Sequence, residues 1–213
     1  MMRFPNGNPI CIHDTNFPAG RRPMEPGVEA ANIELNAYGH FALGRGTGFE
    51  ALQAHLHFCP FSWHSHYHGD KLGINLFGAG EELLCEIGYV TVGRKNRYFT
   101  TSSISHNTVT VEYAGPRPSE TLAKADPEVV GTIARPKAAA AANRPVQDAR
   151  SALLAYDPGG RSGRLVQVVA ASVPDAPHMG LELRTRELLL VALSPERSCL
   201  VDVFRIRGGS RHH

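Results

Sequence analysis

The sequence is divided into short apolar segments that are separated by glycine, proline and polar residues. Within most segments apolar and polar residues alternate, and valine, isoleucine and leucine are frequent. This pattern is typical of β-strands, because alternate side chains of a strand face the same side of a sheet. The segments comprise residues 37–43, 52–58, 71–77, 82–92, 107–113, 129–134, 151–156, 164–173, 181–193 and 199–206. We therefore predict an all-β chain that folds as an antiparallel β-sandwich.

The longest segment, residues 181–193, is also compatible with a helix. It is followed by Ser194-Pro195-Glu196-Arg197 and then by another strand-like segment, residues 199–206. Proline and polar residues between two alternating segments are typical of a turn. We therefore predict a hairpin of two strands here.

Two stretches lack the strand pattern. Residues 1–36 are rich in proline and glycine, and we expect them to be irregular. Residues 114–150 contain ARPKAAAAANRP and few apolar residues, which predicts a long surface loop or an insertion. We assign residues 37–213 to one β-sandwich domain. A sandwich that ended after the Gly208-Gly209 turn would expose an edge strand, so we expect the chain to be an incomplete part of a longer protein.

The charge balance gives no indication of a nucleic-acid partner. Lys and Arg number 22 against 20 Asp and Glu, a net charge of +2, whereas nucleic-acid binding usually needs a strongly basic patch. No stretch approaches the ~18 apolar residues that cross a bilayer, and the first residues contain no signal-peptide core. We expect neither nucleic acid nor a membrane as partner.

The four cysteines, Cys11, Cys59, Cys85 and Cys199, form no CxxC pair. This spacing argues against a zinc ribbon and against a disulfide scaffold. We expect small thiols that are buried or half-buried.

Three histidines alternate in HSHYHGD. His64, His66 and His68 would project from one face of a strand, and Gly69 would permit a bend after them. Imidazole is a common metal ligand, so this run predicts a metal site. The alternative is that these histidines are half-buried polar groups with ordinary hydrogen bonds, which is also how we interpret His40, His55 and His57.

Further ligands are available in the next two segments. Glu86 lies in LLCEIGY and His106 lies in SISHNTV. A set of His68, Glu86 and His106 would offer two imidazoles and one carboxylate, which suits zinc and leaves a fourth position for water or substrate. Asp70 would accept an N–H from a ligand imidazole and fix its orientation.

The two stretches that carry these residues, HSHYHGDKLGINLFGAGEELLCEIGYV and RYFTTSSISHNTVTVE, resemble the heparinase II/III-like polysaccharide lyases. That family shows an HxHxD run, a strand, a G-x-x-L-L turn, an acidic residue before I/P-G, and a histidine in an AHNT-type motif. The later LRTRELLLV and LVDVFRIRGG are similar to paired strands of the family. The resemblance covers residues 38–113 and 180–211.

The resemblance implies an N-terminal (α/α) toroid followed by a supersandwich-like β-domain, with the substrate between them. This chain would carry the first part of the sandwich, and residues 1–36 would be the linker from the toroid. It also implies a zinc ion held by His68, Glu86 and His106. Glu86 departs from the usual aspartate of the family, and Ser105 stands where alanine is common. Such enzymes are periplasmic or secreted.

The activity that the resemblance implies is β-elimination on acidic polysaccharides such as glycosaminoglycans or alginate. Elimination needs a group that neutralises the uronate carboxylate, a base for the C5 proton and an acid for the leaving oxygen. His66 and Tyr98 are the catalytic candidates, and Arg94 and Arg97 are the candidates for binding the anionic polymer. The alternatives are that Tyr98 anchors its loop and that the basic cluster is a solvated surface. Without the toroid we expect little activity.

Two other functions stay open. The same histidines suit a metal-dependent hydrolase, whose activity a chelator would abolish. The sandwich also suits a non-catalytic carbohydrate-binding module in which the histidines only pack.

Overall fold

The structure is a computed structural model, and it describes residues 2–12, 22–59, 70–88, 103–112, 151–160, 165–173, 181–209 and 211–213. Within these ranges the regular structure is β-strand apart from three short 3-10 helices, η1 (Asn36–Tyr38), η2 (Gly48–Glu50) and η3 (Ser103–Ser105). None of the helices in this part of the chain has the length and apolar character that crossing a bilayer needs. The all-β prediction is confirmed.

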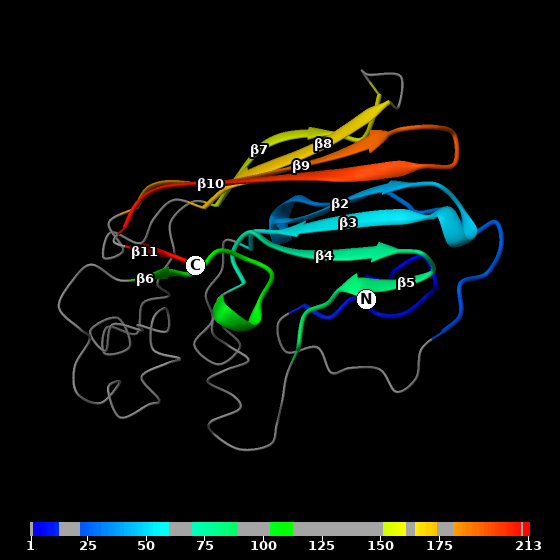
Figure 1. The fold of residues 1–213 in the computed structure, drawn as a ribbon, viewed down its shortest axis with the longest axis horizontal. Helices are drawn as coiled ribbons and strands as arrows, with labels where there is room; N and C mark the ends of the chain where they lie inside the picture. The colour runs from blue at the N-terminus through cyan, green and yellow to red at the C-terminus, as the bar shows by residue number, and fades with distance from the viewer. Residues whose placement is uncertain are drawn as a thin grey trace, which may run out of the picture.

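The strands form two larger antiparallel sheets, which are stacked in Figure 1, and one small two-stranded sheet. The five-stranded sheet follows the chain order: β1 (Ile33–Leu35), β2 (His40–Arg45), β3 (Leu52–His57), β4 (Gly73–Gly78) and β5 (Glu81–Leu84). The four-stranded sheet has the order β10 (Ser198–Gly208), β9 (Leu181–Ala192), β8 (Val166–Ser172) and β7 (Ala152–Asp157). β6 (Val111–Glu112) pairs with β11 (Arg211–His212).

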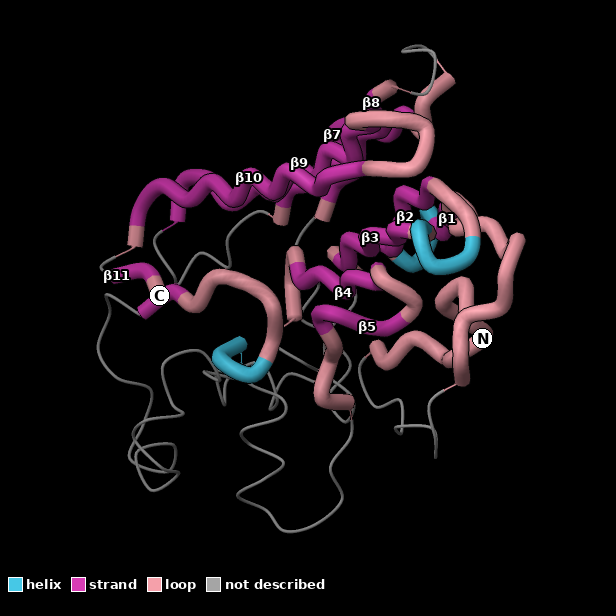
Figure 2. Tube along the Cα trace, turned by 45° about the vertical axis from the view of Figure 1, so that its right-hand side comes forward, coloured by secondary structure: helices cyan, strands magenta, loops and turns pink. Residues whose placement is uncertain are grey.

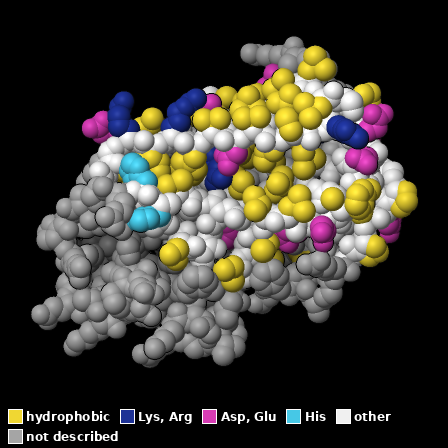
Figure 3. Space-filling model, viewed as in Figure 1, with side chains coloured by type: hydrophobic (Ala, Val, Ile, Leu, Met, Phe, Trp, Pro, Cys, Tyr) yellow, Lys and Arg dark blue, Asp and Glu magenta, His cyan; other side chains and the backbone are white. Residues whose placement is uncertain are grey.

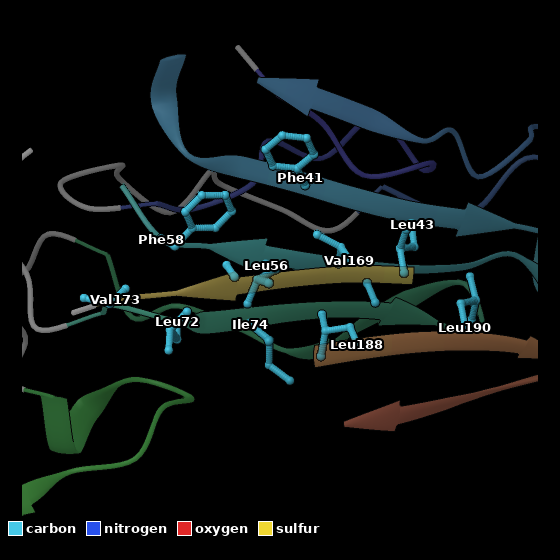
Figure 4. Close-up of a cluster of buried hydrophobic side chains, with 12 residues drawn as sticks. Phe41, Leu43, Leu56, Phe58, Leu72, Ile74, Val169, Val173, Leu188 and Leu190 are labelled. Atoms are coloured by element: carbon cyan, nitrogen blue, oxygen red, sulfur yellow. The ribbon is translucent and has the colours of Figure 1, made fainter. Parts of the chain in front are cut away.

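The main hydrophobic core lies between the two larger sheets. Alternate residues of β2 and β3 face it, so that Phe41 is paired with Leu56 across the two strands and both are fully buried. Val169 of β8 and Leu188 of β9 meet them from the four-stranded sheet, as Figure 4 shows. This alternation, together with burial on the facing sheet, fixes the register of the strands.

The other face of the five-stranded sheet is covered by the N-terminal segment, residues 2–12, which lies beside this sheet and away from the four-stranded one (Figure 2). Phe4 stacks on Phe77 of β4 with ring centroids 5.5 Å apart, and it meets His55 of β3 edge-on at 5.4 Å. Ile10 packs in the same small cluster. The central strands of this sheet, β2, β3 and β4, are therefore buried on both faces.

The four-stranded sheet does not show a strictly polar outer face. Hydrophobic side chains gather over its strands in Figure 3, and charged side chains are spaced along the margin. Among its residues and connections Leu154, Leu165, Leu193 and Val201 are exposed. This departs from the usual alternation of a half-solvated antiparallel sheet.

Most predicted strands match observed ones, and the predicted hairpin is confirmed, because β9 and β10 pair on either side of residues 193–197. Two predicted strands were too long. Residues 82–92 were predicted as one strand, but β5 ends at Leu84 and residues 85–88 leave the sheet. Residues 107–113 were also predicted as one strand, but of the described residues 107–112 only Val111–Glu112 form one. In both places a backbone carbonyl accepts a hydrogen bond from a side chain, that of Cys85 from Asn107 and that of Asn107 from Arg186.

Other differences concern the ends and the cysteines. β1 lies within the stretch that was predicted to be irregular, where it pairs with β2. Cys11 and Cys59 are buried and Cys199 is half-buried, as predicted, but Cys85 is exposed. Burial raises the pKa of Cys11 to about 11, with Glu82 adding to the shift, so its sulfur is an uncharged thiol at neutral pH. The predicted strand at 129–134 and the loop at 114–150 lie outside the described residues.

The core predicts that replacing a buried leucine by alanine will lower the free energy of unfolding much more than replacing an exposed one. Leu188→Ala removes a fully buried side chain between the sheets and should lower the free energy of unfolding by about 3 kcal/mol. Leu193→Ala, in the exposed turn after the same strand, is the matched control and should change it by less than about 0.5 kcal/mol. Urea unfolding followed by circular dichroism measures both, and equal losses would contradict this core.

Candidate functional site

Glu86 and His106 lie in contact in a buried part of the structure. Glu86 follows β5 and His106 follows η3, and Nδ1 of His106 is in hydrogen-bond contact with Oε2 of Glu86. Both residues are less than one-tenth exposed. The structure thus brings together two of the three predicted ligands from segments that are 20 residues apart.

A tight turn places Asp70 next to this pair. The Gly73 amide donates to the Asp70 carbonyl at 2.7 Å, and Leu72 between them has a positive φ of 58°. A Cβ on Gly73 would lie 2.7 Å from that carbonyl oxygen and 3.6 Å from Oε1 of Glu86. A side chain at 73 would therefore clash with the carbonyl of the turn, while its distance from Glu86 would be an ordinary contact.

Asp70 itself is buried and faces His57 of β3. Its Oδ2 lies 3.7 Å from Nε2 of His57, and the two side chains are almost completely covered. Tyr38 is close to this pair, since its ring centroid is 5.4 Å from that of His57. Burial, with Cys59 and Asp70 contributing, raises the pKa of Tyr38 to about 12, so its hydroxyl keeps its proton at neutral pH.

Side chains of the HNT motif hold the site segments together by hydrogen bonds to backbone carbonyls. Asn107 Nδ2 donates to the carbonyls of Ile74 and Cys85, at 3.2 and 3.1 Å. Thr108 Oγ1 donates to the carbonyl of Lys71 at 2.7 Å. The Cys85 carbonyl is thus bonded to a side chain at the point where residues 85–88 leave the sheet.

Two arginines on β9 reach the same segments from the other sheet. Arg186 Nη1 donates to the carbonyls of Leu72 and Asn107, at 2.6 and 2.5 Å, while its Nε and Nη2 bind Asp202 of β10 in a bidentate pair. Arg184 Nη2 donates to the Lys71 carbonyl at 3.2 Å. Neither arginine was predicted as a site residue from the sequence, although arginines at alternate positions of an apolar strand are an unusual pattern that points to buried polar contacts.

The remaining predicted site residues cannot be placed. His66, His68, Arg94, Arg97 and Tyr98 lie outside the described residues. Within the described ranges, no three His, Cys, Asp or Glu side chains are arranged to hold a metal ion. Of the three predicted ligands, Glu86 and His106 are therefore the two that lie within the described ranges.

A match to a protein family shows where this chain belongs. Residues 30–154, which include Asp70, Glu86 and His106, match the family described as Heparinase II/III-like, C-terminal. The chain belongs to this heparinase II/III-like family. The resemblance that the HxHxD and HNT motifs suggested is confirmed.

Solved structures of heparinases share the fold of this family member. A heparinase III is similar with a TM-score of 0.63 and 14% identity, over 98% of this chain and 31% of that one. Heparan sulfate lyase HepC from Pedobacter heparinus is similar with a TM-score of 0.60 and 14% identity, over 97% and 30%. The chain thus spans about a third of the length of these lyases. No curated protein sequence matches it.

The contacts of Arg186 predict a strong effect on stability. Arg186→Ala would leave the Leu72 and Asn107 carbonyls and the Asp202 carboxylate without their donor, which should lower the free energy of unfolding by about 3 kcal/mol. Arg205→Ala removes an exposed arginine that pairs with Glu187 on the same two strands, and should cost less than about 1 kcal/mol. Urea unfolding of both variants gives the comparison, and an Arg186→Ala loss no larger than that of the control would refute the role of Arg186.

Proposed function

We propose that this chain forms the β-sandwich part of a polysaccharide lyase that cleaves uronic-acid glycans by β-elimination, with a structural zinc ion held by His68, Glu86 and His106. The observation that supports the zinc site is the buried contact between Glu86 and His106 inside the family match. Isolated buried carboxylates and imidazoles are costly, and a bound cation is one way in which proteins stabilise them.

The donor set fits zinc in its chemistry. A carboxylate oxygen and imidazole nitrogens are ligands that Zn²⁺ accepts, and the three residues come from three separate segments. When bound, the ion would cross-link these segments and stabilise the fold beside the substrate. Asp70, which ends the HxHxD run, would orient a ligand imidazole by accepting its N–H.

The reaction itself is assigned to other side chains of this chain. β-Elimination removes the C5 proton and expels the leaving oxygen, so no activated water is needed and the ion has a structural role. His66 and Tyr98 would exchange protons with substrate, and Arg94 and Arg97 would bind the uronate or sulfate groups. Heparan sulfate is the first glycan to test, because one similar structure is named a heparan sulfate lyase.

The zinc proposal predicts a metal content that depends on Glu86 and His106. The purified chain, dialysed without chelator, should hold close to one zinc per chain by inductively coupled plasma mass spectrometry. Glu86→Gln and His106→Asn should lose most of it and should no longer show a fall in melting temperature when EDTA is added. His212→Ala, at an exposed histidine, is the matched control and should retain zinc. Unchanged zinc in Glu86→Gln and His106→Asn would overturn this site.

The lyase proposal predicts salt-dependent binding of acidic glycans. Affinity electrophoresis in gels that contain heparan sulfate or alginate should retard the chain, and Arg94→Ala combined with Arg97→Ala should reduce the retardation. Arg205→Ala combined with Arg207→Ala, which removes two exposed arginines from β10, controls for net charge. An equal loss of retardation in both double variants would show that the glycan is attracted by net charge alone and not by Arg94 and Arg97. Chelator-sensitive hydrolysis without unsaturated uronate would favour a hydrolase instead.

A further inference from the structure

A second cluster of buried polar residues lies on the face of the five-stranded sheet that turns away from the main core. His40 of β2 and His55 of β3 are fully buried, and His57 of β3 is 3% exposed. In the register of β2 and β3, His40 is opposite His57, while the small Ala42 and Gly44 are opposite His55 and Gln53. These small residues leave space on this face for the three imidazole rings.

The side chains form a continuous series of contacts, here called the histidine relay: Gln53, His55, His40 and His57. Gln53 Oε1 lies 3.0 Å from Nε2 of His55. Nδ1 of His55 lies 3.0 Å from Nε2 of His40. Nδ1 of His40 then lies 3.3 Å from Nδ1 of His57. The Nε2 atom of His57 faces Oδ2 of Asp70 at 3.7 Å.

The direction of the hydrogen bonds is fixed at the Gln53 end. The amide of Gln53 contacts the carbonyl oxygen of Ala31 at 2.7 Å, and a carbonyl oxygen only accepts, so the atom that faces it is the NH₂ group. The Oε1 atom of Gln53 therefore faces His55, and Nε2 of His55 must carry a proton and donate it. An imidazole can exchange its donor and acceptor nitrogens by moving a proton, whereas the oxygen and nitrogen of an amide keep their roles. The hydrogen bonds at this end of the relay therefore have one direction.

The protons of the next rings follow from this end. Burial, with His40 adding to the effect, lowers the pKa of His55 well below its usual value, so His55 is neutral and carries only the Nε2 proton. Its Nδ1 then accepts from Nε2–H of His40. A neutral His40 in turn accepts at Nδ1 from Nδ1–H of His57. If His57 were neutral as well, its Nε2 lone pair would point toward the buried Asp70 carboxylate.

We propose that the histidine relay is a buried site that holds one proton more than three neutral imidazoles carry. The additional proton makes His57 an imidazolium, which faces the Asp70 carboxylate and positions it. The contact of 3.7 Å is an ion-pair distance in a place almost closed to water, where two facing lone pairs would repel. This makes Gln53, His40, His55 and His57 positioning residues for Asp70. The protonation of the relay concerns these side chains and Asp70 alone, whereas the use of Asp70 to orient a ligand imidazole rests on the proposed function.

The surroundings of His57 are consistent with a single cation there. Tyr38 from η1 keeps its proton at neutral pH and is uncharged, and His40 from β2 is the neighbouring ring. The ammonium group of Lys71, next to Asp70 in the chain, donates a hydrogen bond to the Cys59 carbonyl. Asp70 is the carboxylate whose oxygen faces the His57 ring. An imidazolium at His57 therefore gives Asp70 an opposite charge on the side of the sheet.

The nitrogen spectra of the histidine rings test this proposal without any activity measurement. In the full chain labelled with ¹⁵N-histidine, long-range ¹H–¹⁵N correlation at about pH 7.5, one unit above the ordinary imidazole value, reports which ring nitrogens carry protons. His55 and His40 should be neutral and protonated at Nε2, and His57 should be protonated at both nitrogens. Proximity to the Phe4 ring assigns His55, and proximity to the Tyr38 ring assigns His57.

Two variants separate the relay from a merely structural packing role. Asp70→Asn should remove the second proton of His57 and leave the Nε2 protons of His55 and His40 in place. Gln53→Met removes the acceptor that fixes His55, so His55 and His40 should each show a mixture of the two neutral forms, and the Nδ1 proton of His57 should be partly lost. A neutral His57 in the unaltered chain, or a His40 protonated only at Nδ1, would overturn the proposal. The unaltered chain decides it even if a variant fails to fold.

Discussion

The site depends on hydrogen bonds that Arg186 donates from the four-stranded sheet to the backbone of two loops. Its guanidinium is almost fully buried, binds Asp202 and donates to the carbonyls of Leu72 and Asn107. One of these carbonyls lies in the turn after Asp70, and the other directly follows His106. Because a planar guanidinium has five donors in a fixed geometry, one side chain sets the distance between the two loops. The packing of the sheets is thereby coupled to the positions of Asp70, Glu86 and His106.

The five-stranded sheet has two buried faces with different chemistry. In β3, Ala54 and Leu56 face the hydrophobic core, whereas Gln53, His55 and His57 face the opposite side. The period of two along a strand separates these sets without any special geometry. Phe4 of the N-terminal segment packs on His55 on the polar face, where the three histidines are buried and in contact with one another. The same sheet thus supports the fold on one side and directs charge toward Asp70 on the other.

The alternating segments allowed the strands and the hairpin of β9 and β10 to be predicted, because burial of one face leaves a period of two in the sequence. Motif spacing pointed to Glu86 and His106, which the fold brings into contact. The bonds of Asn107 and Arg186 to carbonyls were not predictable, since they depend on which loop passes each side chain. Those bonds lie in the two stretches that were predicted to be longer strands, at the carbonyls of Cys85 and Asn107. The order of the histidine relay also required coordinates, because the sequence indicated only that His40, His55 and His57 are polar groups with ordinary hydrogen bonds.

The central claim is that Glu86 and His106 meet in order to share an ion with His68. Anomalous diffraction from a crystal of the chain, measured on both sides of the zinc absorption edge, tests this most directly. We expect one peak at about 2.0–2.2 Å from a Glu86 carboxylate oxygen and from ring nitrogens of His106 and His68. A zinc peak at the exposed His212 and His213 alone, or density that shows Glu86 bonded only to His106 with no ion beside them, would contradict it.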